Sequence, residues 1–111
     1  MFEQRSEPRV TLSRSVPVRD AHTAEPLGRL INLSRHGFMV LSAAHLAPGR
    51  AYRLTAALET PAAGENELTL TGRCIWCQQA SGTDSYGAGF SIESRDDDAA
   101  RVIEALLDDP S

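Results

Sequence analysis

The residues best suited to chemistry lie in one stretch, Asn32-Leu33-Ser34-Arg35-His36-Gly37. Asn32 and Ser34 are two residues apart, so on an extended backbone the amide and the hydroxyl point the same way. Gly37 can adopt a positive φ or let a ligand approach closely. Together with the guanidinium of Arg35, these groups suit an anionic ligand that accepts hydrogen bonds. The same residue types also form ordinary turns.

The elements on either side must position this stretch. Leu30-Ile31 precedes it and Phe38-Met39-Val40-Leu41 follows it. Short apolar runs bounded by polar residues and glycine are typical of β-strands. We therefore expect the polar group at the end of a β-hairpin.

The rest of the chain predicts more strands and one helix. Apolar residues alternate with polar ones in several short segments, and Pro48-Gly49 and the loop over residues 59–66 separate some of them. The predicted strands lie at about 10–18, 28–33, 38–42, 51–58, 67–78 and 86–92. Residues 102–107 change to helical spacing, and the acids at 96–98 suit the start of a helix. This order predicts an all-β fold, a small antiparallel six-stranded barrel with a C-terminal helix.

Length and composition indicate one domain in two parts. Residues 1–9 show no hydrophobic period and predict a flexible arm, whereas residues 10–111 form the barrel and its helix. No apolar run is long enough to span a membrane, and the N-terminus lacks the apolar core of a signal peptide. We expect a cytoplasmic protein without membrane insertion, whose two cysteines are thiols.

The charge pattern is unevenly distributed. All eleven basic residues are arginines; residues 1–35 hold six of them against four acids, and residues 36–111 hold five against eleven. A mainly acidic body argues against binding DNA or RNA, which needs a broad basic surface. A compact anion site remains possible, and arginine suits two-pronged recognition of a phosphate or a guanine edge.

Two motifs give the chain a family resemblance. Arg5-Ser6-Glu7-Pro8-Arg9 fits R-x-x-x-R, and Asn32 to Gly37 fits [D/N]-x-S-x-x-G, beginning 23 residues after Arg9. In this order, before and within a β-rich pattern, the motifs resemble those of the PilZ domain, the bacterial receptor for cyclic di-GMP. Trp76, the stretch Tyr86 to Phe90 and the final helix also fit that family. The resemblance implies a Greek-key, split-barrel arrangement of the six strands.

The resemblance also implies a ligand and its site. The ligand is cyclic di-GMP, with no further cofactor, no metal and no catalytic residue. The implied binding residues are Arg5, Arg9, Asn32, Ser34 and Gly37. A guanidinium can bond the O6 and N7 atoms of guanine, pair with phosphate or stack on a base. Gln4 stands where many relatives carry another arginine, so one ligand or a stacked pair both remain open.

For several other residues the sequence allows either a role in ligand or metal binding or an ordinary structural role. Arg35 either contacts phosphate or is solvated, and Trp76 either flanks a base or packs on the barrel. Cys74 and Cys77 form a C-x-x-C; three apart on a strand, their thiols should diverge, which favours packing over zinc or redox chemistry. His22, His36 and His45 stand in separate turns.

Two functions follow from these observations. The first is a non-enzymatic receptor or adaptor in which cyclic di-GMP orders the arm over the barrel and changes the surface shown to an unidentified protein effector. The alternative is a PilZ-like protein-interaction module with little or no affinity for the nucleotide. An enzyme is a distant third reading.

Overall fold

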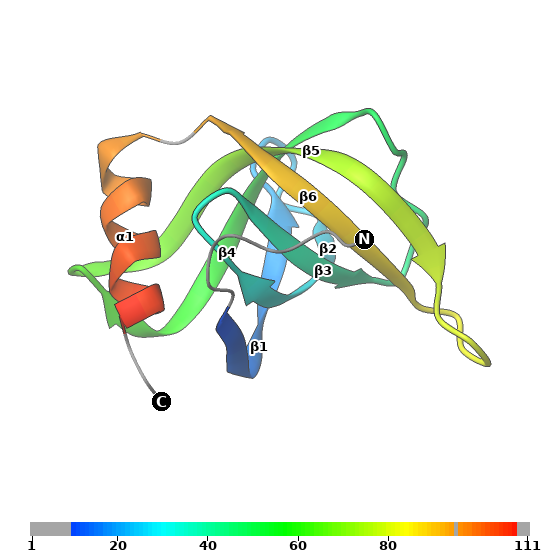
Figure 1. Cartoon of the computed structure of the whole chain (residues 1–111), viewed down its shortest axis with the longest axis horizontal. Coiled ribbons are helices and arrows are strands. Elements are labelled where there is room, and N and C mark those ends of the chain that lie inside the picture. The colour runs from blue at the N-terminus through cyan, green and yellow to red at the C-terminus, as the bar shows by residue number, and fades with distance from the viewer. Residues whose placement is uncertain (1–9, 95, 109–111) are drawn as a thin grey trace, which may run out of the picture.

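The computed structural model describes residues 10–94 and 96–108 (Figure 1). Side chains are described for the same ranges, except those of residues 10–15, 59, 60 and 108. The predicted arm, residues 1–9, lies outside the described residues, and with it Gln4, Arg5 and Arg9. Within the described ranges, the model contains no helix whose length and hydropathy would let it cross a membrane.

Six strands followed by one helix make up the described chain, which confirms the predicted order. The elements are β1 (Val10–Asp20), β2 (Pro26–Leu33), β3 (Gly37–Ser42), β4 (Ala51–Ala62), β5 (Glu65–Gln79), β6 (Tyr86–Ser94) and α1 (Asp97–Asp108). Most strands extend beyond the predicted bounds, because the alternation of side chains fades at strand ends before the backbone pairing does.

The strands close into an antiparallel barrel in the order β1-β2-β3-β6-β5-β4 (Figure 1). β3 pairs with β6 instead of with β4, which gives the Greek-key connection. β1 pairs with β4 over Val18, Arg19 and Asp20, and these pairs close the barrel. These pairings confirm the predicted six-stranded antiparallel barrel with its C-terminal helix, and the barrel is closed.

The barrel interior is filled by apolar side chains from all six strands. Leu33 and Val40 are almost completely buried, and the rings of Phe38 and Phe90 stack with centroids 4.8 Å apart. Gly72 lies against this stack, because a Cβ there would be 2.7 Å from the Phe38 ring. The interior is packed, so the ligand site must lie on the outside.

The predicted loop over residues 59–66 is wrong. β4 continues to Ala62 and β5 begins at Glu65, so the connection is the two-residue turn Ala63-Gly64. Both residues have positive φ, 51° and 81°. Two positive φ values define the turn that matches the twist of antiparallel strands. Pro61 suggested a loop, but a proline can be accommodated where the ladder is irregular, and the register shifts between Ala57 and Ala62.

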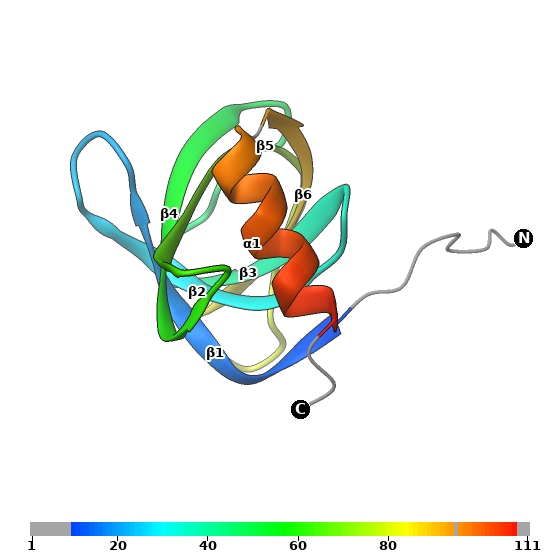
Figure 2. The same ribbon diagram turned by 90° about the vertical axis from the view of Figure 1, so that its left-hand side faces the viewer.

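The helix α1 lies across one end of the barrel (Figure 2). Asp96 caps it, because its Oδ1 accepts a hydrogen bond from the Ala99 amide at 2.8 Å. Ala99, Val102 and Ile103 are buried, and the helix packs against β4 and β5. This confirms the prediction that the acidic run begins a helix.

Candidate ligand-binding site

The connection between β2 and β3 carries the second motif and is held by short hydrogen bonds. The Ser34 amide donates to the Gly37 carbonyl at 2.8 Å, and the Ser34 hydroxyl donates to the same oxygen at 3.3 Å. The Ile92 amide of β6 donates to the His36 carbonyl at 2.8 Å. The loop is therefore tied both to itself and to the neighbouring strand.

The polar group predicted on this loop is only partly exposed. Ser34 is completely buried, whereas Asn32 and Arg35 are half-buried. Gly37 is buried, pairs with Ser91 and does not have positive φ. Of the two possibilities that the sequence left open for Gly37, positive φ is not used, because this residue begins β3 with extended backbone instead of forming the turn.

Asn32 faces the outside of the barrel because β2 contains an extra residue. Leu30 pairs with Val40, but Asn32 pairs with Met39, so Ile31 has no partner in β3. Strict alternation would put Asn32 on the same inner face as Leu30. The β-bulge at Ile31 moves the amide to the outer face, where its Nδ2 lies 3.7 Å from the Met39 sulfur.

Trp76 reaches the outer face by the same device. Cys74 pairs with Phe90 and Trp76 pairs with Gly89, so Ile75 is the extra residue of a second bulge. The side chain of Trp76 is 42% exposed and that of Ile75 is 60% exposed. Each bulge thus lies one residue before a residue that the resemblance implies is functional.

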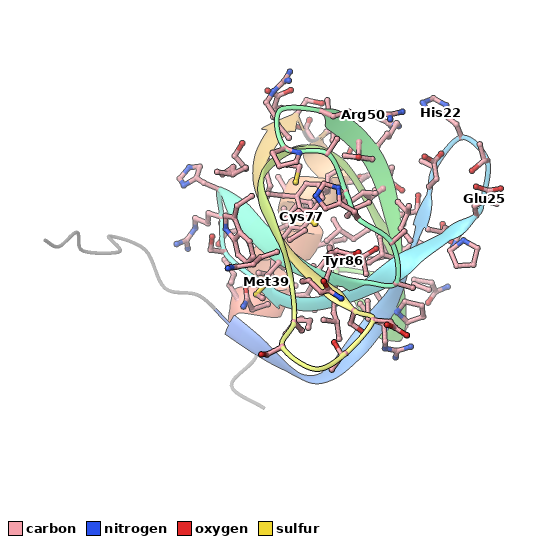
Figure 3. The ribbon with its side chains drawn as sticks, turned by 90° about the vertical axis from the view of Figure 1, so that its right-hand side faces the viewer. His22, Glu25, Met39, Arg50, Cys77 and Tyr86 are labelled. Atoms are coloured by element: carbon pink, nitrogen blue, oxygen red, sulfur yellow. The ribbon has the colours of Figure 1, made fainter. Side chains whose placement is uncertain are left out.

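The two bulged strands flank β3 and β6 and bring these residues onto one row. Asn32 pairs with Met39, Met39 with Gly89, and Gly89 with Trp76. The row crosses four adjacent strands on the outer face; Figure 3 labels Met39, whose side chain points outward from β3. We call Asn32, Met39, Gly89 and Trp76 the outer row. The predicted site residues Asn32 and Trp76, 44 positions apart in sequence, therefore belong to one surface.

Gly89 lets the indole of Trp76 lie close against β6. A Cβ on Gly89 would overlap the Nε1, Cε2 and Cδ1 atoms of Trp76, and a Cβ on Gly87 would be 3.7 Å from the same ring. The absence of a Cβ at Gly89 therefore makes room for one side of the indole, and Trp76 remains 42% exposed. An indole held in this way offers a planar apolar surface for a nucleobase.

Arg35 is not simply solvated. Its Nε donates to the Oε2 of Glu104 at 2.7 Å, and its Nη2 donates to Oε1 at 3.0 Å. Glu104 belongs to α1, so this two-pronged ion pair joins the motif loop to the helix. The pair has bidentate geometry, the strongest form of contact between a guanidinium and a carboxylate.

The two cysteines do not diverge, and that prediction is wrong. Cys74 pairs with Phe90 and Cys77 with Ala88, and both partners are buried, so the bulge turns both thiols inward. Burial, followed by the neighbouring Cys77, raises the pKa of the Cys74 thiol. Both cysteines are free, and the Cys77 sulfur accepts a bond from the Leu46 amide at 3.3 Å. Their packing role is the one that the sequence favoured.

The other residues that could bind a metal ion do not form a cluster in the part of the chain that the structure describes. Within residues 10–94 and 96–108, no three histidine, cysteine or acidic residues group in a way that could hold a metal ion. His22 lies on the hairpin between β1 and β2, which projects from the barrel on the opposite side of the view from Met39 (Figure 3).

Two residues near the motif loop were not predicted from the sequence. They are Met39 of the outer row and Glu104 of α1, which pairs with Arg35. Met39 lies between the buried residues Phe38 and Val40, so its outward direction was readable from alternation in β3. Glu104 follows the buried Ile103 on a helix, which places it near the edge of the packed face, but its partner 69 positions earlier has no sequence signal.

The fold resembles those of several solved structures. The PilZ domain with c-di-GMP of YcgR from Escherichia coli is 14% identical, with a TM-score of 0.69, 95% of this chain covered and 89% of that chain. The MrkH–c-di-GMP complex of K. pneumonia is 18% identical, with a TM-score of 0.70 and coverages of 96% and 52%. The inhibitor of motility MotI/DgrA of Bacillus subtilis is 13% identical, with a TM-score of 0.71 and coverages of 96% and 51%.

At these identities the likeness establishes the fold, and this chain spans about half the length of the last two structures. No curated protein sequence matches it. The sequence model of the PilZ domain matches residues 3–109, a range that contains both motifs. This match covers nearly all of the 111 residues, so the chain belongs to the PilZ domain family.

Proposed function

We propose that this chain is a non-enzymatic receptor that binds cyclic di-GMP on the outer face of its barrel. The observation that carries the proposal is the outer row, in which two bulges place Asn32 and Trp76 on one surface beside the motif loop. Family membership supports the ligand class, and the similar structures of the YcgR PilZ domain and of MrkH are complexes with c-di-GMP.

The proposed site consists of two parts of the chain. The motif loop and outer row contribute Asn32, Ser34, Arg35, Gly37 and Trp76. Asn32 supplies an amide that both donates and accepts, and Ser34 keeps the loop in shape through its bonds to Gly37. Trp76 supplies a stacking surface for guanine.

The second part is the R-x-x-x-R motif, with Arg5, Arg9 and, less centrally, Gln4. We propose that the two guanidinium groups bind the phosphates or guanine edges of the ligand. Residues 1–9 would then close over the outer row and change the surface that the protein presents to a protein effector. Such a ligand-dependent ordering of a segment is a common switching mechanism.

The proposed compartment is the cytoplasm. Cys74 and Cys77 are both free, which suits a reducing environment. The family's ligand is a small intracellular messenger, so receptor and ligand would share this compartment.

The competing candidate is an interaction module of the same fold with little nucleotide affinity. The intact motifs favour the receptor, whereas the exposed Trp76 suits either candidate, because tryptophan stacks on bases and is also enriched at protein–protein interfaces. The two candidates differ in one measurable quantity, the affinity for cyclic di-GMP.

Calorimetric titration with cyclic di-GMP tests the proposal, with GTP and cyclic GMP as controls. Saturable binding of cyclic di-GMP alone supports the receptor. Arg9→Ala should weaken binding by about 1.5–3 kcal/mol, the range for hydrogen bonds to charged groups. Wild-type-like binding by Arg9→Ala would place the ligand elsewhere. Equal binding of GTP would indicate generic phosphate binding.

Trp76 gives a second test, because it is the only tryptophan of the chain. Stacking on guanine should change its fluorescence on titration with cyclic di-GMP. Trp76→Ala should weaken binding by about 1–3 kcal/mol, the range for base–aromatic stacking. Ile75→Ala is the matched control, since its side chain is more exposed and belongs to the same bulge. Equal losses in the two variants would argue against stacking on the indole.

A further inference from the structure

The ion pair between Arg35 and Glu104 links the proposed ligand site to the C-terminal helix. Both donor–acceptor distances are short, 2.7 Å and 3.0 Å, and the two nitrogens face the two carboxylate oxygens. The side chains are 43% and 47% exposed. Exposed ion pairs usually contribute little to folding stability, but a bidentate arginine–carboxylate pair is an exception, because its two hydrogen bonds hold both groups in one geometry.

The backbone around each residue of the ion pair is held in place by neighbouring contacts. The Arg35 backbone lies between Ser34, which bonds Gly37, and His36, whose carbonyl accepts from Ile92. Glu104 follows Ile103, which is 2% exposed. The helix α1, which carries Glu104, packs on β4 and β5 and lies across the end of the barrel (Figure 2). The helix therefore holds the carboxylate in place relative to the loop.

A long arginine side chain loses rotamer freedom when it binds a ligand, and that loss reduces affinity. The Glu104 carboxylate already holds the Nε and Nη2 atoms of Arg35 in the free protein. Part of the rotamer freedom is therefore lost before the ligand binds, and ligand binding loses less. Arg35 directly follows Ser34 in the motif loop, so the side chain that Glu104 orders belongs to the loop of the proposed site.

We propose that Glu104 is a positioning residue of the ligand site, which orients Arg35 for the phosphate or guanine of cyclic di-GMP and so couples α1 to ligand binding. The inference rests on the proposed function. Coupling between two elements is reciprocal. If Glu104 prepares Arg35 for the ligand, then the bound ligand must in turn stabilise the contact between the loop and α1.

The first test is the affinity of Glu104→Gln for cyclic di-GMP by calorimetry. Glutamine keeps the shape and removes the charge, so binding should weaken about two- to tenfold, the equivalent of immobilising one long side chain. The matched control is Glu67→Gln, which breaks the Arg19–Glu67 pair at 2.7 Å with side chains 37% and 51% exposed. This control pair joins β1 to β5 and should change affinity less than about twofold.

Two further readouts separate positioning from a structural role. In an Arg35→Gln background, Glu104→Gln should cause no additional loss of affinity, because its effect passes through Arg35. Glu104→Asp keeps the charge on a shorter side chain and should restore part of the affinity. In the wild type, cyclic di-GMP should slow amide exchange in the second half of α1, and Glu104→Gln should abolish this slowing.

The outcomes distinguish this inference from the proposed function. If the wild type does not bind cyclic di-GMP, both are overturned. If the wild type binds while Glu104→Gln binds equally well or more tightly, only the positioning role of Glu104 is overturned. Faster exchange of α1 on ligand binding would also overturn it, since the ligand would then take Arg35 away from Glu104.

Discussion

Two regions of the barrel are built in different ways. The ladder between β4 and β5 pairs without a shift from Ala51–Arg73 to Ala57–Glu67. The outer row crosses β2, β3, β6 and β5 and contains the bulges at Ile31 and Ile75. A bulge interrupts ladder hydrogen bonds and re-aims the side chain that follows it. The regular region therefore serves stability, and the irregular region directs polar and aromatic groups outward.

The glycines sharpen the same contrast. Gly64 is in the turn that joins β4 to β5 because its backbone has a φ of 81°, and no atom lies within 4 Å of the position of its missing Cβ. Gly89 does not have a positive φ. Glycine is required there because the indole of Trp76 occupies the position that a Cβ would take. One glycine serves the backbone and the other makes room for a side chain.

The largest expected effect is on stability and lies in the regular region. Leu54 of β4 is 4% exposed, so Leu54→Ala should lower the free energy of unfolding by about 2–5 kcal/mol, the range for buried leucines. Leu41→Ala on the outer face, where the side chain is 37% exposed, should cost much less. Urea denaturation measures both. Similar losses would mean that the two regions contribute alike.

A smaller effect is expected at Gly89. Gly89→Ala puts a methyl group into the indole, and Trp76 must move off β6. The cost should be about 1 kcal/mol, at the low end for overpacking, because an exposed ring can swing away. Tryptophan emission should shift to longer wavelength as the ring becomes more exposed, and cyclic di-GMP should bind more weakly.

Gly87→Ala is the control for that experiment. A Cβ there would be 3.3 Å from the Met39 Cε and 3.7 Å from the indole, so only a flexible methionine tip must yield. Its emission and affinity should stay close to those of the wild type. Identical spectra for both alanine variants would contradict the specific need for glycine at position 89 beneath Trp76.

The smallest effect concerns pH and lies at Asp20, which ends β1 and pairs with Leu54 of β4. Hydrogen bonds from the Thr23 and His22 amides, at 3.0 Å and 2.7 Å, hold the pKa of Asp20 below its usual value of 3.8. A carboxylate whose pKa is lower in the folded state stabilises the fold above its unfolded pKa. That stabilisation is lost as pH falls through the folded value.

Thermal melts between pH 6 and pH 3 test this expectation, in a range chosen to bracket roughly the usual carboxylate pKa. Asp20→Asn should reduce the pH dependence of the melting midpoint slightly and leave the affinity for cyclic di-GMP unchanged. An unchanged pH dependence would show that the turn after β1 does not depend on the charge of Asp20.

Much of the fold could be predicted because it depends on local patterns. Alternation located all six strands, and the helical spacing of residues 102–107 located α1. The prediction of a loop over residues 59–66 was wrong. Proline and glycine such as Pro61 and Gly64 indicate an interruption of a strand, but they do not distinguish a long loop from a tight turn. The predicted divergence of Cys74 and Cys77 failed because it assumed that no residue is inserted in β5.

The sequence by itself determined the order of elements, the capped helix and the motif residues, since each is encoded in neighbouring residue types. Only the tertiary structure decided which of these residues share a surface. Asn32 and Trp76 meet on the outer row because bulges form where strands must fit their neighbours in a closed barrel. Arg35 meets Glu104 because α1 folds back over the barrel, a contact across 69 positions that no local pattern encodes.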